Sequence, residues 1–159
     1  MSNLIQPDIP ETLPLEDDMG KPYALHLHDD DKSWTLKVFD RRVLVAQVNC
    51  LVQGDALLLA DIHVFDEARL PEGMFVSWLR SALGLKPRTA NYQRRGMGTR
   101  LLQIVIERAR RRNLSRIAGN LFPRDLSARP DLPTWYRNHG FEVDLATDGA
   151  SGKISLDLR

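Results

Sequence analysis

The residues best suited to chemistry in this sequence surround two glycines that directly precede a long helix-forming run. Gly96 and Gly98 flank Met97, and the run 100–112 that follows has apolar residues at helical spacing. Glycines at such a start let the backbone turn tightly, so a ligand can approach the N–H groups of the first helical turn. The helix dipole adds partial positive charge at this end. We therefore predict a loop that binds phosphate or pyrophosphate.

Basic side chains surround the predicted loop. Residues 86–116 contain ten Lys or Arg and one acid, Glu107, a field able to steer a polyanion towards the loop. Coenzyme A and nucleic acid are both ligands of this kind. A P-loop needs Gly-Lys-Ser/Thr, and the dinucleotide fingerprint needs a third glycine where Leu101 stands, so neither motif is present. The alternative interpretation is a plain loop before a surface helix whose arginines keep it soluble.

A second group of candidates is polar and lies on predicted strands. The period of two places Leu58, Ala60, Ile62 and Val64 on the core face of a strand over 56–65, which leaves the opposite face polar. Such a face usually marks the solvated side of an antiparallel sheet. Two titratable residues, Asp61 and His63, lie on the polar face of this strand, and the alternative to a solvated surface is a catalytic role for them.

These residues must be positioned by a sheet. Alternating apolar patterns predict an antiparallel meander, because its connections are too short for parallel crossovers. A strand, helix and strand passage over 100–122 permits one parallel pair. We expect an α/β (α+β) fold with a mixed, mostly antiparallel central sheet of about seven strands, flanked by helices. The predicted strands cover about 23–28, 34–39, 43–53, 56–65, 114–122, 141–146 and 153–158.

The length of 159 residues and a hydrophobic content of 43% suit one well-cored domain. Residues 1–20 contain three prolines and little periodicity, which predicts an extended or mobile N-terminal arm before a single domain over 21–159. An inserted segment is expected at about 66–91, with a short helix over 73–84. The sequence shows no membrane span or export signal, and its single cysteine, Cys50, agrees with a reducing compartment. We expect a cytoplasmic protein without a metal.

A third signal lies near the end of the chain. Residues 135–141 read Trp-Tyr-Arg-Asn-His-Gly-Phe, in which Gly140 can end a short helix begun at Pro133, and two strands follow. The glycine loop and this segment, in this order and in this strand sequence, resemble the GNAT superfamily of N-acetyltransferases. In that superfamily, Gln-x-x-Gly-x-Gly opens the helix that holds the acyl-coenzyme A pyrophosphate, and an aromatic-Tyr-x-x-x-Gly-Phe helix precedes two final strands. The resemblance covers roughly residues 34–158.

The resemblance implies a site and an activity: acetyl transfer from acetyl-CoA to a primary amine by direct attack in a ternary complex. The implied general acid is Tyr136, which would protonate the departing thiolate, as a phenol with a pKa near 10 is suited to do. We favour His63, assisted by Asp61, as the base that takes the amine proton. The implied cofactor-binding residues are His63, Val64, Phe65, Gln93, Arg94, Arg95, Gly96, Met97, Gly98, Thr99 and Arg100.

The sequence departs from the superfamily in its acceptor region. Only residues 29–33 separate the first two predicted strands of the domain, where relatives usually have one or two helices, and the predicted insertion stands elsewhere. Two other functions therefore remain open: an acyl-CoA-binding module without turnover, and a nucleic-acid-associated basic protein. The arginines of 108–112 lack interleaved aromatic residues, which disfavours nucleic acid. We expect acetyl-CoA and an amine as partners, no membrane partner, and a monomer or homodimer.

Overall fold

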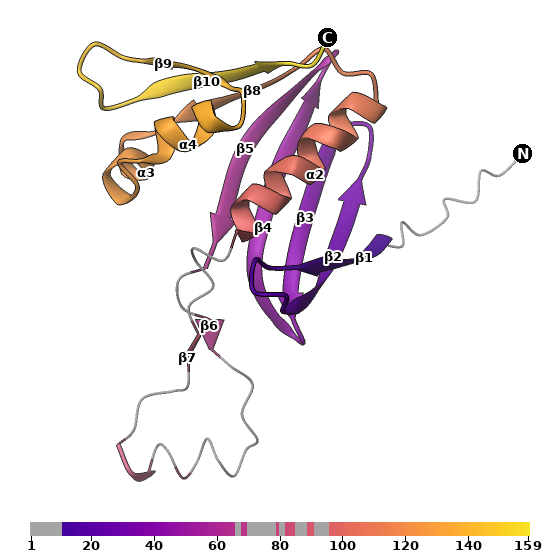
Figure 1. The fold of residues 1–159 in the computed structure, drawn as a ribbon, viewed down its shortest axis with the longest axis vertical. Helices are drawn as coiled ribbons and strands as arrows, with labels where there is room; N and C mark the ends of the chain where they lie inside the picture. The colour runs from indigo at the N-terminus through magenta and orange to yellow at the C-terminus, as the bar shows by residue number, and fades with distance from the viewer. Residues whose placement is uncertain (1–10, 66–67, 70–78, 80–81, 85–88, 91–95) are drawn as a thin grey trace, which may run out of the picture. The chain divides into compact units, whose positions relative to one another are not determined.

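The computed structural model describes residues 11–65, 68–69, 79, 82–84, 89–90 and 96–159 (Figure 1). The described helices are α2 (Met97–Arg111), α3 (Pro123–Ala128) and α4 (Leu132–Asn138). The described strands are β1 (Glu11–Glu16), β2 (Pro22–Asp29), β3 (Ser33–Asp40), β4 (Val43–Gln53), β5 (Ala56–Val64), β6 (Ala68–Arg69), β7 (Thr89–Ala90), β8 (Arg116–Leu121), β9 (Glu142–Leu145) and β10 (Gly152–Asp157).

Eight of these strands form one sheet in the order β1-β2-β3-β4-β5-β8-β10-β9. Antiparallel pairs join β1 to β2, β8 to β10 and β10 to β9. The pair of β5 and β8 is parallel, because α2 carries the chain back between them. The prediction of a mixed, mostly antiparallel sheet is confirmed, and each of the seven predicted strands corresponds to a strand of this sheet.

The eighth strand, β1, lies inside the segment that we predicted to be an arm. Its Leu13 and Leu15 pair with Leu25 and Tyr23 of β2, and Leu15 is buried. The alternation is short and Pro14 interrupts it, so the sequence pattern is weak. Proline is tolerated here because β1 is an edge strand, where an N–H is not needed on the outer side.

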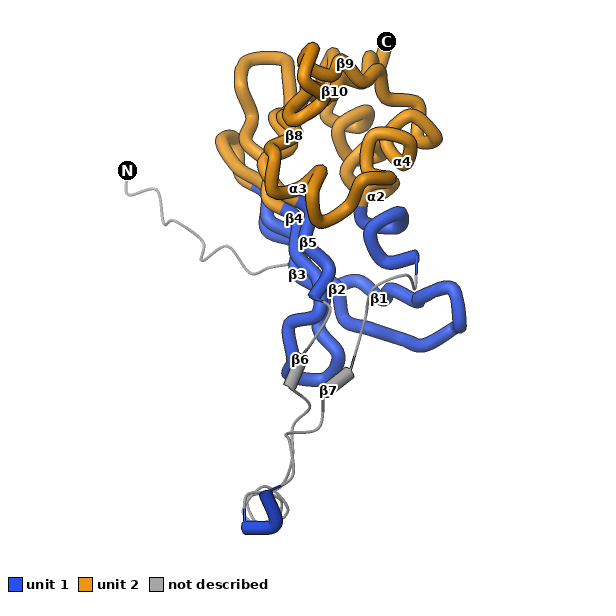
Figure 2. Tube along the Cα trace, turned by 90° about the vertical axis from the view of Figure 1, so that its left-hand side faces the viewer, with its two compact units in different colours: residues 1–29, 35–48, 62–101 blue, residues 30–34, 49–61, 102–159 orange. Residues whose placement is uncertain are grey.

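The described chain divides into two compact units (Figure 2). The first unit comprises residues 1–29, 35–48 and 62–101, and contains β1, β2 and the first turn of α2. The second comprises 30–34, 49–61 and 102–159, and contains β8, β9, β10, α3 and α4. No helix among the described residues is both long and apolar enough to cross a membrane.

Helix α2 buries the stripe that its sequence predicts. The residues of this stripe are at most 9% exposed: Leu101, Leu102, Val105, Ile106 and Ala109. Arg108, Arg110 and Arg111 occupy the last turn, where the helix dipole favours cations.

The predicted core face of β5 is wrong. The buried residues are Leu57 and Leu59, whereas Ala60 is exposed. Three consecutive leucines, 57–59, fit either face, so the sequence leaves the phase of the alternation undefined. By the period of two, Asp61 and His63 continue the face of Leu57 and Leu59, at the end of the strand where that face becomes exposed.

Candidate cofactor-binding and catalytic site

The start of α2 has the geometry that an anion-binding turn needs. Gly96 has φ +74°, a left-handed conformation that glycine adopts without strain. Its carbonyl accepts the N–H of Arg100 at 3.0 Å, so Gly96 makes the first helical hydrogen bond and directly precedes Met97, the first residue of α2. The N–H groups of the first turn have no helical carbonyl to bond, and that turn contains no acidic side chain.

An anion of the protein itself already lies at this start. A Cβ built on Gly96 would overlap the carboxylate of Asp18, which belongs to the turn between β1 and β2. One oxygen of the same carboxylate lies 3.8 Å from an Arg100 guanidinium nitrogen. Both segments belong to the first unit. Because a carboxylate is accommodated against Gly96 and Arg100, the described part of the loop fits a negatively charged group.

Three of the predicted cofactor-binding residues lie outside the described residues: Gln93, Arg94 and Arg95. Most of the predicted insertion, 66–91, lies outside them as well. Within it, the described Leu83 N–H donates to the Leu79 carbonyl at 3.1 Å, a bond with helical spacing.

The end of β5 carries the other predicted cofactor contacts. Pairing with β8 runs from Ala56 opposite Arg116 to Leu59 opposite Gly119, and β5 then continues to Val64. At Gly119 a Cβ would lie 3.0 Å from the Leu59 carbonyl oxygen, so a side chain here would crowd the last pair. This pairing with β8 thus ends before the segment 63–65 that carries the predicted cofactor contacts.

The side chains of His63 and Phe65 contact each other at the end of β5. Their rings meet edge to face with centroids 4.6 Å apart, and His63 is exposed. The N–H of Phe65 donates to the Val45 carbonyl at 3.0 Å, which holds this end of the chain against β4. An exposed imidazole at this place is accessible to a substrate or to water.

Tyr136 is 6% exposed and lies on α4. Its ring meets those of Trp135 and Phe141 edge to face, with centroids 4.8 and 5.3 Å away. Burial raises the pKa of Tyr136, Arg129 opposes this rise, and the nearby negative charges of Asp125 and Asp61 add to it. The phenol therefore holds its proton throughout the neutral range.

Two of the predicted catalytic residues, Asp61 and Tyr136, lie in the second unit. The charge of Asp61 acts on the Tyr136 hydroxyl, although Asp61 is exposed and Tyr136 is buried. Cys50 contributes to the same pKa shift, and burial raises its own pKa from 9.0 to about 12. Asp18, which lies against Gly96, and Asp125, whose charge acts on Tyr136, were not among the residues predicted from the sequence. No sequence motif marks either of them, because both relationships arise only on folding.

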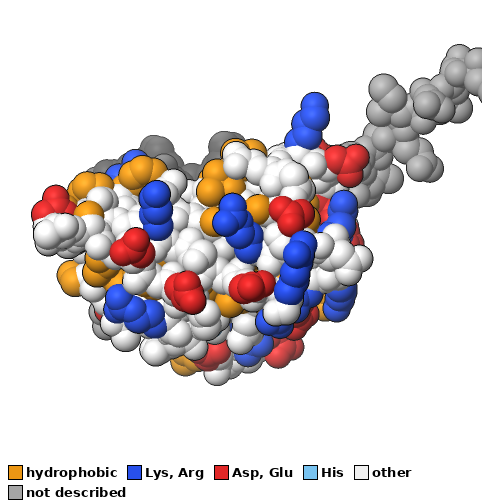
Figure 3. All heavy atoms as spheres, turned by 90° about the horizontal axis from the view of Figure 1, so that it is seen from above, with side chains coloured by type: hydrophobic (Ala, Val, Ile, Leu, Met, Phe, Trp, Pro, Cys, Tyr) orange, Lys and Arg blue, Asp and Glu red, His pale blue; other side chains and the backbone are white. Residues whose placement is uncertain are grey.

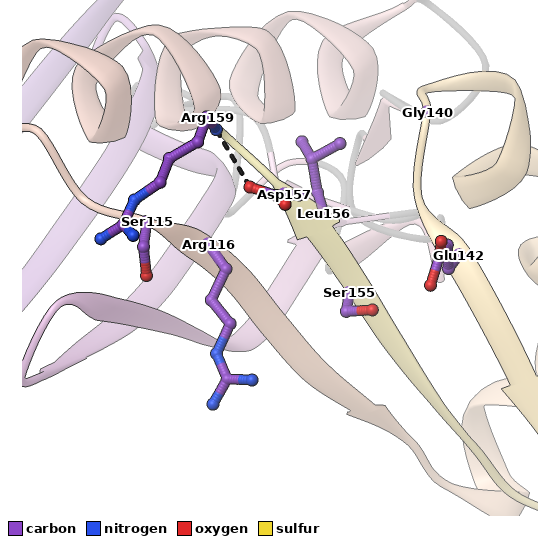
Figure 4. Close-up of a pocket in the computed structure, with 8 residues that line it drawn as sticks. All are labelled: Ser115, Arg116, Gly140, Glu142, Ser155, Leu156, Asp157 and Arg159. Carbon is purple, nitrogen blue, oxygen red and sulfur yellow. Dashed lines mark hydrogen bonds between the residues drawn. The ribbon is translucent and has the colours of Figure 1, made fainter.

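Two surface hollows of the second unit contain none of the predicted site residues. The larger, of about 430 Å³, is lined by charged side chains of both signs, including Arg116, Glu142 and Asp157 (Figure 4). The smaller, of about 320 Å³, lies beside Phe122 and Leu145. Among the described residues there is no cluster of three or more His, Cys, Asp or Glu suited to a metal ion.

The arginines at the end of α2 lie close to acids. Arg111 lies 3.9 Å from a carboxylate oxygen of Glu107, and Arg112 lies 3.8 Å from one of Asp31. Figure 3 shows a face on which basic and acidic side chains are interspersed. These observations support a solvated helix end rather than a continuous basic surface.

Comparison with solved structures identifies the fold. The GNAT domain of S. lividans PAT superposes with a TM-score of 0.63 over 92% of this chain and 97% of that domain, at 12% identity. The ribosomal-protein-S18-alanine N-acetyltransferase of Escherichia coli gives 0.54 at 16% identity, over 82% of this chain and 72% of that one. A Bacillus subtilis acetyltransferase in complex with CoA gives 0.50 at 16% identity, over 81% and 79%.

No family model matches the chain, and the search of curated proteins finds no match. The structural likeness nevertheless extends over about four fifths of the chain in several independent acetyltransferases. The chain therefore has the GNAT fold, and the fold that the sequence resemblance implied is confirmed.

Proposed function

We propose that the protein transfers an acetyl group from acetyl-CoA to a primary amine. The observation that carries the proposal is the environment at the start of α2. The first turn of this helix contains no acidic side chain, and a carboxylate from another segment lies against Gly96 and Arg100. A pyrophosphate carries charge of the same sign, and more of it, and offers more oxygen acceptors to the same donors. Bound CoA supplies the thioester to be attacked, and residues 93–100 would hold its phosphates.

The reaction joins the amine nitrogen to the thioester carbonyl carbon and breaks the carbon–sulfur bond. The amine must lose a proton, and the exposed His63, with Asp61, is our candidate for accepting it directly or through water. The backbone at the end of β5, residues 63–65, would orient the pantetheine arm and polarise the carbonyl. Neither step requires a covalent intermediate on the protein.

Tyr136 is our candidate for stabilising the departing thiolate. Because burial raises its pKa above the ordinary phenol value, full proton transfer to a thiolate, with a pKa near 8.5, is uphill. We therefore assign to Tyr136 a hydrogen bond that strengthens as negative charge develops on sulfur. The thiolate takes its proton from solvent after it leaves, and the base returns the amine proton to solvent. Asp61, whose charge acts on Tyr136, would tune that donor.

An acetyl-CoA-binding module without turnover is the second candidate, since residues 29–33 leave little room for the usual acceptor-binding helices. The setting we propose is the cytoplasm, and the oligomeric state, monomer or homodimer, stays a prediction. Salt-sensitive nucleic-acid binding that CoA does not displace would favour the third interpretation instead.

The deciding experiment measures thiol release from acetyl-CoA with a panel of primary amines: amino acids, polyamines and peptides with a free N-terminus or lysine. If the protein transfers acetyl groups, thiol release should depend on one class of amine, and mass spectrometry should show the matching acetylated product. Tight acetyl-CoA binding without release from any amine would favour the binding module. Absence of acetyl-CoA binding would contradict both.

A further inference from the structure

The turn that carries Asp18 is held rigidly by its neighbour in sequence. The side chain of Asp17 is 2% exposed and accepts hydrogen bonds from the Met19 and Lys21 N–H groups, both at 2.9 Å. Its other oxygen accepts the Tyr23 hydroxyl at 3.0 Å. Gly20, with φ +76°, completes the turn. A buried, bonded carboxylate in a tight turn fixes the direction of the next residue along the chain.

The carboxylate of the next residue, Asp18, lies beside the start of α2. It supplies from a separate segment the acid that the first turn of the helix lacks. Asp18 is 64% exposed as a side chain and its guanidinium neighbour Arg100 is 44% exposed, so neither group is sealed in. A ligand approaching from solvent can displace this carboxylate without opening the core.

We propose that Asp18 is a built-in competitor for the phosphate site at Gly96. This proposal rests on the proposed function, because it concerns the same loop. The carboxylate occupies the approach to Gly96 in the free protein, and CoA binds when its pyrophosphate displaces the carboxylate from Gly96 and Arg100. The partial positive charge of the helix start is thereby paired with a negative group in both states.

The consequence for binding follows from population arithmetic. The apparent affinity equals the intrinsic affinity multiplied by the fraction of molecules whose site is free, so removal of the competitor raises it by the inverse of that fraction. Repulsion between Asp18 and the incoming phosphates acts in the same direction. Because the interaction of a charge with a helix start has a free energy equivalent to a factor of about 3 to 30 in binding, we expect a change of this size in the affinity for CoA.

The test compares CoA binding by calorimetry in the wild type, Asp18→Asn and Glu16→Gln. Glu16 is exposed in the same hairpin, so Glu16→Gln removes an equal charge without touching Gly96. We expect Asp18→Asn to bind CoA about 3-fold to 30-fold more tightly and Glu16→Gln to stay within about 2-fold of the wild type. Inorganic pyrophosphate, measured as a competitor of CoA, should gain affinity for Asp18→Asn in the same proportion.

Equal CoA affinity in the wild type and Asp18→Asn would overturn the competitor and leave the CoA site intact. Weaker binding by Asp18→Asn would overturn it as well, because Asp18 would then be a ligand of the cofactor. An equal gain in Glu16→Gln would reduce the effect to general charge and also overturn it. If none of the three proteins binds CoA, both the proposed function and the competitor proposal fail. This outcome is distinguishable from the three above, in which CoA still binds.

A ligand-free readout tests the contact itself. In Asp18→Asn the backbone amide resonances of Gly96 and Met97 should shift, whereas Glu16→Gln should leave them in place. Unshifted amides in Asp18→Asn would overturn the proposal, whatever the CoA affinities are.

Discussion

The carboxylate of Asp18 lies where a side chain on Gly96 would begin. One residue belongs to the turn after β1, and the other directly precedes α2, the helix whose start we propose binds a cofactor phosphate. Two reasons favour glycine at position 96. Its φ is positive, and a carboxylate takes the space where a Cβ would lie.

The first prediction concerns the helix start. Gly98→Glu should weaken CoA binding by at least about 100-fold, because a carboxylate and its stem would occupy the second position of α2, where phosphate must approach the backbone. Gln103→Glu adds the same charge to an exposed position further along the helix and should change the dissociation constant by less than about 3-fold. Equal CoA affinity in both variants by calorimetry would refute the anion site.

The second prediction concerns the phenol. Tyr136→Phe should lower the rate of transfer by about 10-fold to 1,000-fold, because it removes a donor to the departing thiolate. CoA affinity should stay near the wild-type value, since the hydroxyl acts on charge that develops during the reaction. Steady-state kinetics and calorimetry separate the two effects, and full activity of Tyr136→Phe would remove this residue from the mechanism.

The third prediction concerns the base. If His63 is the base, kcat/KM of the wild type should rise with pH as the imidazole loses its proton. His63→Ala should remove this rising limb and lower kcat/KM by about 100-fold or more at neutral pH, with CoA affinity unchanged. Asp61→Asn should show a smaller loss. If the limb survives in both variants, the amine loses its proton through its own equilibrium or through water, and neither side chain is the base.

The fourth prediction is a pH dependence of stability. Burial raises the pKa of the Cys50 thiol from 9.0 to about 12, so the folded protein keeps a proton that the unfolded chain loses. The contribution of the protonated thiol to the free energy of unfolding is complete below pH 9 and falls as the pH rises towards 12. Between pH 8 and 10.5 the wild type should lose about 2 kcal/mol of unfolding free energy more than Cys50→Ala. Urea unfolding at the two pH values measures this difference, and equal losses in the two proteins would contradict it.

The strand sequence, the α2 stripe and the parallel pair were predictable because each depends on local periodicity. The strand β1 was missed, because Leu13 and Leu15 give only two steps of alternation around a proline. The phase of β5 was wrong, because leucines 57–59 fit either face. The contact of Asp18 with Gly96 and the electrostatic influence of Asp61 on Tyr136 join segments far apart in sequence, and no local pattern encodes either of them.

The central claim is that the start of α2 binds the phosphates of acetyl-CoA. The most direct measurement is a titration of isotope-labelled protein with acetyl-CoA, followed by amide resonances. The account predicts saturable shifts that are largest at Gly96, Met97, Gly98 and Thr99, and that Gly98→Glu abolishes. Saturable shifts confined to other places, such as the hollow around Arg116 and Asp157, or no shifts at millimolar acetyl-CoA, would contradict it.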